Sequence, residues 1–217
     1  PGNKVMFTNV NSYLLGKVVE LVSGLSLDQF FNKELFMPLG MKNTTFNPTA
    51  QLLDMIAPTE IVEEKGMIHG EVHDESARAL GGIAGHAGLF STVDDLNCFC
   101  QLWLHEGMYN GHHFFSKSLA QEAIKNQVLA DAPGTGFGWM LNRGWMGQLR
   151  PLSFGHTAFT GPSIIITPDY HLAVILFTNR TYPHRTNADR HIYQAKMMNI
   201  LSVELTIKKE ASNEIVE

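Results

Sequence analysis

Apolar residues recur at helical spacing near the beginning of the chain. They occupy positions i, i+1, i+4, i+5 and i+8 of one segment, namely Leu14, Leu15, Val18, Val19 and Val22. This spacing predicts an amphipathic helix from about Asn11 to Ser23, with Gly24 in the left-handed conformation that often ends a helix. Ser26 is expected to cap a second helix, which runs from Leu27 to about Phe36 before Pro38-Leu39-Gly40-Met41 breaks it and turns the chain.

The segment 42–90 has little periodicity and is rich in Gly, Pro and His, which predicts long loops with short helical pieces. Its last part, Gly81-Gly82-Ile83-Ala84-Gly85-His86-Ala87-Gly88, suits tight turns and close backbone approach. The stretch Ser91-Thr92-Val93-Asp94 has the Ser-x-x-acid spacing of a helix start, and that helix should end near Gly107. Ser116 is expected to cap a further helix that reaches about Asn126.

After Gly134 the pattern changes to strands. Phe137–Leu141 is aromatic, and Ser163–Thr167 and Leu172–Phe177 are β-branched or apolar throughout. The turn 168–171 should join the last two runs into an antiparallel hairpin. Their continuous apolarity predicts a sheet that is covered on both faces, with a last helix from about Ala188 to Leu201 as one cover.

This order of elements predicts an α+β fold, in which an antiparallel sheet is covered by helices and a mostly helical lobe lies beside it. We expect the domain to span 1–205, with the helical lobe at about 9–130, the sheet region at about 135–205, and a polar tail at 206–217. Three strands make a thin sheet with a bare edge. Together with an opening Pro1-Gly2-Asn3-Lys4 and no initiator Met, the thin sheet suggests an internal piece of a longer chain.

Composition narrows the class of protein. The 217 residues are 44% hydrophobic and 17% charged, which excludes intrinsic disorder as the main state. A net charge of −5 argues against a nucleic-acid partner, and no apolar run is long enough to span a membrane. Cys98 and Cys100 lie two residues apart in an expected helix and are not expected to pair with each other.

Five stretches, in this order, resemble the serine β-lactamase and penicillin-binding-protein-like superfamily. They are Phe7-Thr8-Asn9, the Leu14-Leu15-Gly16 helix, Phe36-Met37-Pro38-Leu39-Gly40-Met41-Lys42-Asn43-Thr44-Thr45-Phe46, Gly85-His86-Ala87-Gly88-Leu89-Phe90-Ser91 and Gly155-His156-Thr157-Ala158-Phe159-Thr160-Gly161. The resemblance covers about residues 5–205. It is greatest to the branch of class C β-lactamase-like proteins, esterases and low-molecular-weight penicillin-binding proteins of type 4B.

The resemblance implies a β-lactamase/transpeptidase-like fold and acyl transfer at a serine. It gives catalytic roles to His156 and to Phe159, whose N–H would help to form an oxyanion hole. It gives substrate-binding roles to Asn9, Thr157 and Ala158, and it places Thr157 on a strand antiparallel to Ser163–Thr167. Phe7 stands where the family has a Tyr, and a phenyl ring cannot relay a proton. Ala158 replaces the family's Gly.

The family's Ser-x-x-Lys nucleophile motif does not occur in these 217 residues, because no Ser has Lys three positions on. The resemblance therefore places the nucleophile before Pro1 and implies that this stretch alone cannot perform the covalent step. It implies a small-molecule or peptide substrate with a D-peptide, β-lactam or ester bond, no cofactor, and a periplasmic or otherwise extracytoplasmic location. The alternative is a catalytically degenerate relative that binds peptidoglycan-like ligands.

Several residues allow a second interpretation. Asn9 could cap the following helix instead of binding a substrate amide. His86 could act in catalysis or could hydrogen-bond loop carbonyls and hold its turn. His69, His73 and His86 with nearby carboxylates could form a metal site, although no third ligand has diagnostic spacing, and we expect no metal. The Arg180–Arg185 turn could bind a carboxylate or form a salt bridge that closes the last helix.

Overall fold

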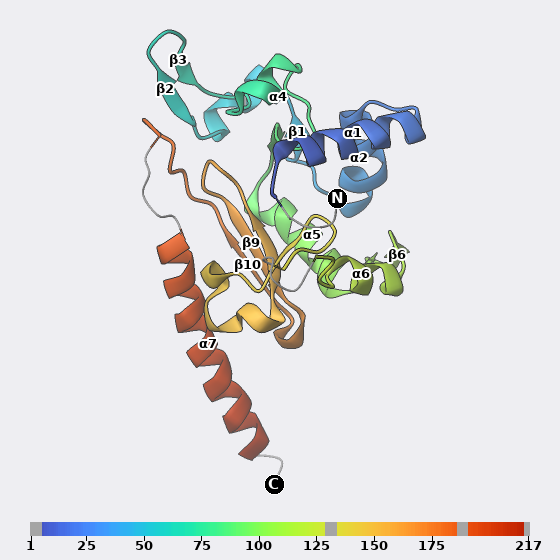
Figure 1. The fold of residues 1–217 in the computed structure, drawn as a ribbon, viewed down its shortest axis with the longest axis vertical. Coiled ribbons are helices and arrows are strands. Elements are labelled where there is room, and N and C mark those ends of the chain that lie inside the picture. The colour runs from blue at the N-terminus through green and yellow to red at the C-terminus, as the bar shows by residue number, and fades with distance from the viewer. Residues whose placement is uncertain (1–5, 129–133, 186–190, 215–217) are drawn as a thin grey trace. The chain divides into compact units, whose positions relative to one another are not determined.

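The structure is a computed structural model that describes residues 6–128, 134–185 and 191–214 (Figure 1). The chain forms two compact units. The first comprises residues 1–99 and 177–187, and the second comprises residues 100–176 and 188–217. The opening residues Pro1 to Lys4 and the start of the expected last helix lie outside the described residues.

The first unit begins with two adjacent helices (Figure 1). Helix α1 spans Asn9–Ser23 and ends at Gly24, whose φ of 70° confirms the predicted left-handed cap. Helix α2, Leu27–Phe31, continues through a π-helical segment, η1 (Asn32–Phe36), and α3 (Met37–Leu39). The helix ends within the expected stretch Pro38–Met41, although it continues to Leu39 instead of ending near Phe36. Pro38 lies in the first turn of α3, where proline is tolerated, and Gly40 ends the helix at φ 74°.

The apolar stripe of α1 is largely exposed within this unit. Leu14, Leu15, Val18 and Val22 are each more than half exposed, and the only fully buried residue of α1 is Gly16. The spacing correctly predicted the helix, but the face that packs within this unit is the one with small residues.

The segment between residues 42 and 90 contains more strand than expected. The antiparallel strands β1, Thr45–Phe46, and β4, Leu89–Phe90, form one short ladder. A hairpin of β2, Glu60–Val62, and β3, Gly66–Ile68, forms a second ladder. Two short helical segments complete this region, η2 at Ala50–Met55 and α4 at Glu75–Ala79.

Helix α5, Val93–Leu104, begins at a buried polar junction. The hydroxyl of Thr92, not that of Ser91, accepts the hydrogen bond from the Asp95 N–H at 3.2 Å, which corrects the expected cap by one residue. The buried carboxylate of Asp95 accepts hydrogen bonds from the Asn43 N–H and the Thr44 hydroxyl, both at 2.7 Å. The turn after α3 is thereby attached to the start of α5.

The second unit contains a four-stranded antiparallel sheet in the order β10-β9-β8-β7. Its strands are β7 at Met140–Leu141, β8 at Phe154–Thr157, β9 at Ser163–Thr167 and β10 at Leu172–Leu176. The register Val174↔Ile165 confirms the predicted hairpin. The strand expected at 137–141 is shorter because Gly138 adopts a positive φ of 75°.

Both faces of this sheet are covered within the second unit, as its apolarity predicted. The 3₁₀ segment η3, Gly144–Leu152, and helix α7, His191–Glu214, pack together (Figure 1) and contact Ile165 on one face. On the other face, edge-to-face aromatic contacts join three side chains of different elements, namely Trp103, Trp139 and Phe154.

Two helices of the second unit differ in length from the prediction. Helix α6 spans Lys117–Ala123 with the predicted Ser116 cap, and it follows a short hairpin of β5, Met108–Tyr109, and β6, His112–His113. Helix α7 continues to Glu214 instead of ending at Leu201. The segment after Leu201 contains no Gly or Pro, so nothing in it ends the helix.

Candidate active site

The Phe7-Thr8-Asn9 segment forms the start of α1. Thr8 is the N-cap residue, and its hydroxyl accepts a hydrogen bond from the Val10 N–H at 3.3 Å. Asn9 is the first residue of the helix and is exposed. The alternative in which Asn9 caps this helix is therefore wrong. Phe7 is also exposed, so the phenyl ring in the expected Tyr position is not a core residue of the chain.

Helix α1 lies directly against the Gly81–Gly88 loop. Gly16 and Gly85 are the points of closest approach, because a Cβ added at Gly85 would lie 2.1 Å from the Ser12 carbonyl oxygen. A Cβ added at Gly16 would lie 3.2 Å from the Gly85 Cα. Only glycine allows this backbone-to-backbone contact. The contact fixes the helix whose first residue is Asn9.

The same loop is held by a carboxylate. The Nε2 atom of His86 donates a hydrogen bond to Asp74 Oδ1 at 3.0 Å, and this oxygen also accepts from the Ala77 N–H at the start of α4. Burial disfavours the charged form of Asp74, but the hydrogen bonds from Ala77 and His86 outweigh it and hold the pKa of Asp74 below its ordinary value. The expectation that His86 bonds loop carbonyls is corrected, because its partner is a side chain.

The His156-Thr157-Ala158 motif lies in the second unit, at the end of β8. Thr157 pairs with Ser163 of the antiparallel strand β9, as the motif predicted. The Ala158 N–H donates to the Pro162 carbonyl at 2.8 Å and closes the turn between these strands. Ala158 and Phe159 are exposed in this turn, whereas Thr157 is buried.

His156 is a neutral imidazole near pH 7. Burial lowers its pKa below the ordinary value of 6.5, and the nearby Arg143 charge lowers it further, against the opposing effect of the hydrogen bond to Thr157. The Nδ1 atom lies 3.0 Å from the Thr157 carbonyl oxygen, which can only accept, so Nδ1 carries the proton and Nε2 has the lone pair. His156 can accept a proton but supplies no permanent charge.

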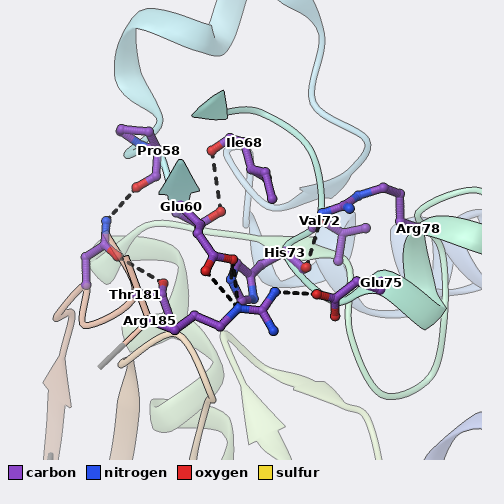
Figure 2. A network of polar contacts seen from close by, with 11 residues as sticks. Pro58, Glu60, Ile68, Val72, His73, Glu75, Arg78, Thr181 and Arg185 are labelled. Carbon is purple, nitrogen blue, oxygen red and sulfur yellow. Dashed lines mark hydrogen bonds and ion pairs between the residues drawn. The ribbon is translucent and has the colours of Figure 1, made fainter. Parts of the chain in front are cut away.

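A network of charged residues, which the sequence did not reveal, lies elsewhere in the first unit (Figure 2). Arg185 donates through Nε to both carboxylate oxygens of Glu60, at 2.9 and 2.7 Å, and through a terminal nitrogen to Glu75. His73 Nε2 lies 2.9 Å from Oε2 of this buried glutamate, the same oxygen that accepts from Arg185 Nε at 2.7 Å. Arg185 therefore ties the segment 177–185 to β2 and α4 rather than closing the last helix.

These contacts determine the charge of both glutamates. Burial opposes the ionisation of Glu60, but hydrogen bonds from Arg185 and His73 outweigh burial and hold its pKa below the ordinary value. The hydrogen bond from Arg185 likewise lowers the pKa of Glu75. Both glutamates are therefore ionised at neutral pH. It could not have been found from local spacing, because Glu60 and Arg185 are 125 positions apart.

The histidines of the considered metal site have separate partners. His69 bonds the Ile56 carbonyl at 2.7 Å, His73 bonds Glu60, and His86 bonds Asp74. In the part of the chain that the structure describes, no three His, Cys, Asp or Glu side chains are grouped as a metal site would require. Cys100 is fully buried, and burial raises the pKa of its thiol to about 12, so it is no nucleophile at neutral pH.

The α+β fold and the two motifs are typical of serine hydrolases that act by acyl transfer. The chain belongs to the β-lactamase family, whose model, described as "Beta-lactamase", matches residues 1–197.

Curated relatives agree with this assignment. A protein of Escherichia coli O157:H7, provisionally named D-alanyl-D-alanine carboxypeptidase, is 34% identical over 212 residues, which are 87% of this chain and 48% of the relative. A protein of Salmonella typhi with the same name is 34% identical over 206 residues, or 85% of this chain and 46% of the relative. The chain thus spans about half the length of the curated relatives it matches.

Solved structures support the fold. A β-lactamase from Mycobacterium bovis is similar with a TM-score of 0.67 at 19% identity, over 95% of this chain and 66% of that structure. A penicillin-binding protein homologue from Pyrococcus abyssi gives a TM-score of 0.66 at 20% identity, over 95% and 44%. Among the helices of the described ranges, none has both the length and the apolar character needed to cross a bilayer.

Proposed function

We propose that this chain is part of a serine hydrolase that transfers the acyl group of a D-alanyl peptide, in the class C-like branch that includes penicillin-binding proteins of type 4B. The observation that supports the proposal most directly is the similarity to relatives named as D-alanyl-D-alanine carboxypeptidases, which covers 87% of the chain. Carboxypeptidases of this kind act on cell-wall peptides, so the proposed location is periplasmic or otherwise extracytoplasmic.

The proposed roles fall on residues of the two motifs. Asn9 would orient the substrate through its side-chain amide, while Thr157 and Ala158 would bind the substrate beside His156. The Phe159 N–H would point at the substrate carbonyl oxygen and stabilise the negative charge that develops there. This chemistry needs no metal or cofactor, because the nucleophile, the base and the oxyanion donors are all parts of the protein.

The Ser and Lys of the nucleophile motif would come from chain outside these 217 residues, in which no Ser-x-x-Lys occurs. The family's relay phenol is replaced by Phe7, so proton transfer must use another group. His156 is one candidate, because its neutral Nε2 can take a proton at pH 7.

The alternative function is the reversible binding of peptidoglycan-like ligands without turnover. Two substitutions favour it. Phe7 removes the relay hydroxyl, and Ala158 adds a methyl group to the proposed substrate-binding motif.

Covalent labelling with a fluorescent penicillin distinguishes these functions. We expect the 217-residue chain to remain unlabelled and the complete protein, with the coding sequence that precedes Pro1, to gain one acyl group on an upstream Ser-x-x-Lys serine. The matched control is the same protein with that serine changed to alanine. A complete protein that binds a D-alanyl-D-alanine peptide reversibly and takes no label supports the alternative. An acyl adduct on any serine of the 217 residues contradicts both assignments.

A further inference from the structure

Two residues form the tip of a tight turn in the glycine-rich loop before β4. Ala84 and Ala87 exchange backbone hydrogen bonds at 3.2 and 3.3 Å, and Gly85 and His86 lie between them. The backbone of Gly85 touches α1, whereas the side chain of His86 bonds Asp74 at the start of α4. The tip therefore connects two helices, and a movement of one tip residue moves the other.

The base of this turn is fixed on α4 by apolar contacts. Ala77 of α4 and Ala84 are buried together with Val72, and Ala87 packs against this cluster. Arg78, also of α4, donates a hydrogen bond to the Val72 carbonyl at 2.9 Å. These contacts hold the two ends of the turn but leave its tip able to hinge.

His86 supplies the contact that holds the tip. Its side chain is only 5% exposed, and its Nε2 donates to Asp74 Oδ1 at 3.0 Å. Its Nδ1 is buried and has no hydrogen-bond partner among the residues that the structure describes, which costs free energy. An apolar side chain of similar size would fill this place without that cost. What the histidine adds is the hydrogen bond to Asp74.

The other side of the tip meets α1 close to its first residue. A Cβ at Gly85 would lie 2.1 Å from the Ser12 carbonyl oxygen, and Ser12 follows Asn9 by about 4.5 Å along the helix axis. Helix α2 contacts α1 further along, where the Leu27 N–H donates to Glu20 at 3.1 Å. Through these contacts the tip holds the start of α1, and α2 holds its end.

We propose that His86 and Asp74 are positioning residues for the side-chain amide of Asn9, an inference that rests on the proposed function. Neither residue needs to touch the substrate. Asp74 is fixed as the N-cap of α4, where its Oδ1 also accepts from the Ala77 N–H at 2.8 Å. Through His86 it holds the tip, and the tip holds the start of the helix from which Asn9 would reach the substrate. A misplacement of about 1 Å can cost about 10²-fold in rate.

A double-mutant cycle in the complete protein tests this proposal. The test variant is His86→Leu, which removes the hydrogen bond to Asp74 together with the unpartnered Nδ1, so the fold should be retained. His86→Gln is the conservative variant, because its side-chain amide can donate from the position of Nε2. The matched control is His69→Leu, at a half-buried histidine of the same unit that bonds a backbone carbonyl at 2.7 Å. Each His86 variant is also made together with Asn9→Ala.

We expect His86→Leu to lower kcat/KM for a D-alanyl peptide at least about tenfold, because Asn9 is no longer aligned with the substrate amide. His86→Gln should stay within about threefold of the unchanged protein, and His69→Leu within about twofold. In the Asn9→Ala background, His86→Leu should have no further effect, because the group that it positions is absent. A purely structural role of His86 would give the same loss in both backgrounds.

Hydrogen exchange in the same proteins follows the start of α1 without reference to catalysis. The amides of residues 12–16 should exchange at least about fivefold faster in His86→Leu than in the unchanged protein. The His69→Leu control should exchange like the unchanged protein.

Two results would overturn the proposal. One is an equal loss of kcat/KM by His86→Leu with and without Asn9, and the other is unchanged exchange at the start of α1. A complete protein that turns over no D-alanyl peptide contradicts the proposed function instead. The exchange rates alone then support or overturn the placement of α1 by His86.

Discussion

Replacing Gly85 by alanine should loosen α1 from the loop beneath it. The added Cβ would lie 2.1 Å from the Ser12 carbonyl oxygen, whereas real Cβ atoms stay at least 3.0 Å from such neighbours. The helix or the loop must therefore move by about 0.9 Å, and neither side of the contact is a side chain that could rotate away.

The expected cost follows from two opposing effects. Overpacking of a rigid contact costs about 1–3 kcal/mol. Alanine also restricts the unfolded chain more than glycine does, which returns about 0.4–1 kcal/mol. We therefore expect Gly85→Ala to lower the free energy of unfolding by about 1–2 kcal/mol.

Urea unfolding followed by far-UV circular dichroism measures this change, and hydrogen exchange of the α1 amides shows where it acts. Gly144→Ala is the matched control, because a Cβ at Gly144 meets nothing within 4 Å and the backbone is not in the left-handed region. The control should be as stable as the unchanged chain or slightly more stable. Equal stability of the two variants, with unchanged exchange in α1, would refute the close contact.

Three further predictions concern charge, thiol reactivity and catalysis. Arg185→Gln should cost about 1–3 kcal/mol, because it leaves the buried Glu60 with one partner fewer, whereas the exposed control Arg150→Gln should cost little. The pKa values of Glu60 and Glu75 are lowered from 4.5, so the ion pairs with Arg185 stabilise the fold above that pH. The difference in free energy of unfolding between the wild type and Arg185→Gln, measured by urea titration, should therefore shrink as the pH falls below 4.5. A thiol reagent at pH 8 should label Cys98 in the folded chain and Cys100 only after unfolding, as read by mass spectrometry. In the complete protein, Phe7→Tyr should raise the turnover of a D-alanyl peptide or ester at least about tenfold by restoring a relay hydroxyl, and an unchanged rate with intact folding would mean that Phe7 does not occupy the relay position.

Local patterns in the sequence predicted the elements well where the partners are close along the chain. The β9–β10 hairpin, the Gly24 cap and the Ser116 cap all depend on contacts within a few residues, and the structure confirms them. The placement of Thr157 on a strand antiparallel to β9 is also confirmed, although that prediction came from a family motif and not from periodicity.

Contacts between distant residues could not be predicted in this way. Asp95 bonds residues more than 50 positions away, and Glu60 bonds Arg185 across 125 positions. A carboxylate within a short apolar stretch has the same local pattern whether its partner is water or a distant arginine. The π-helical segment at Asn32–Phe36 could not be predicted from the sequence either, because it continues the helix to Pro38 without a change in hydrophobic spacing.

Helix α1 shows what hydrophobic spacing can and cannot establish. The spacing identified which side chains share one face, and the structure places them on one face. It did not establish what that face contacts, because the glycine pair Gly16 and Gly85 gives the helix a different packing side. The apolar stripe is therefore correct in position but largely exposed within the first unit. Since Asn9 is the first residue of this same helix, the close contact of Gly16 and Ser12 with Gly85 also helps to set the orientation of the proposed substrate-binding amide.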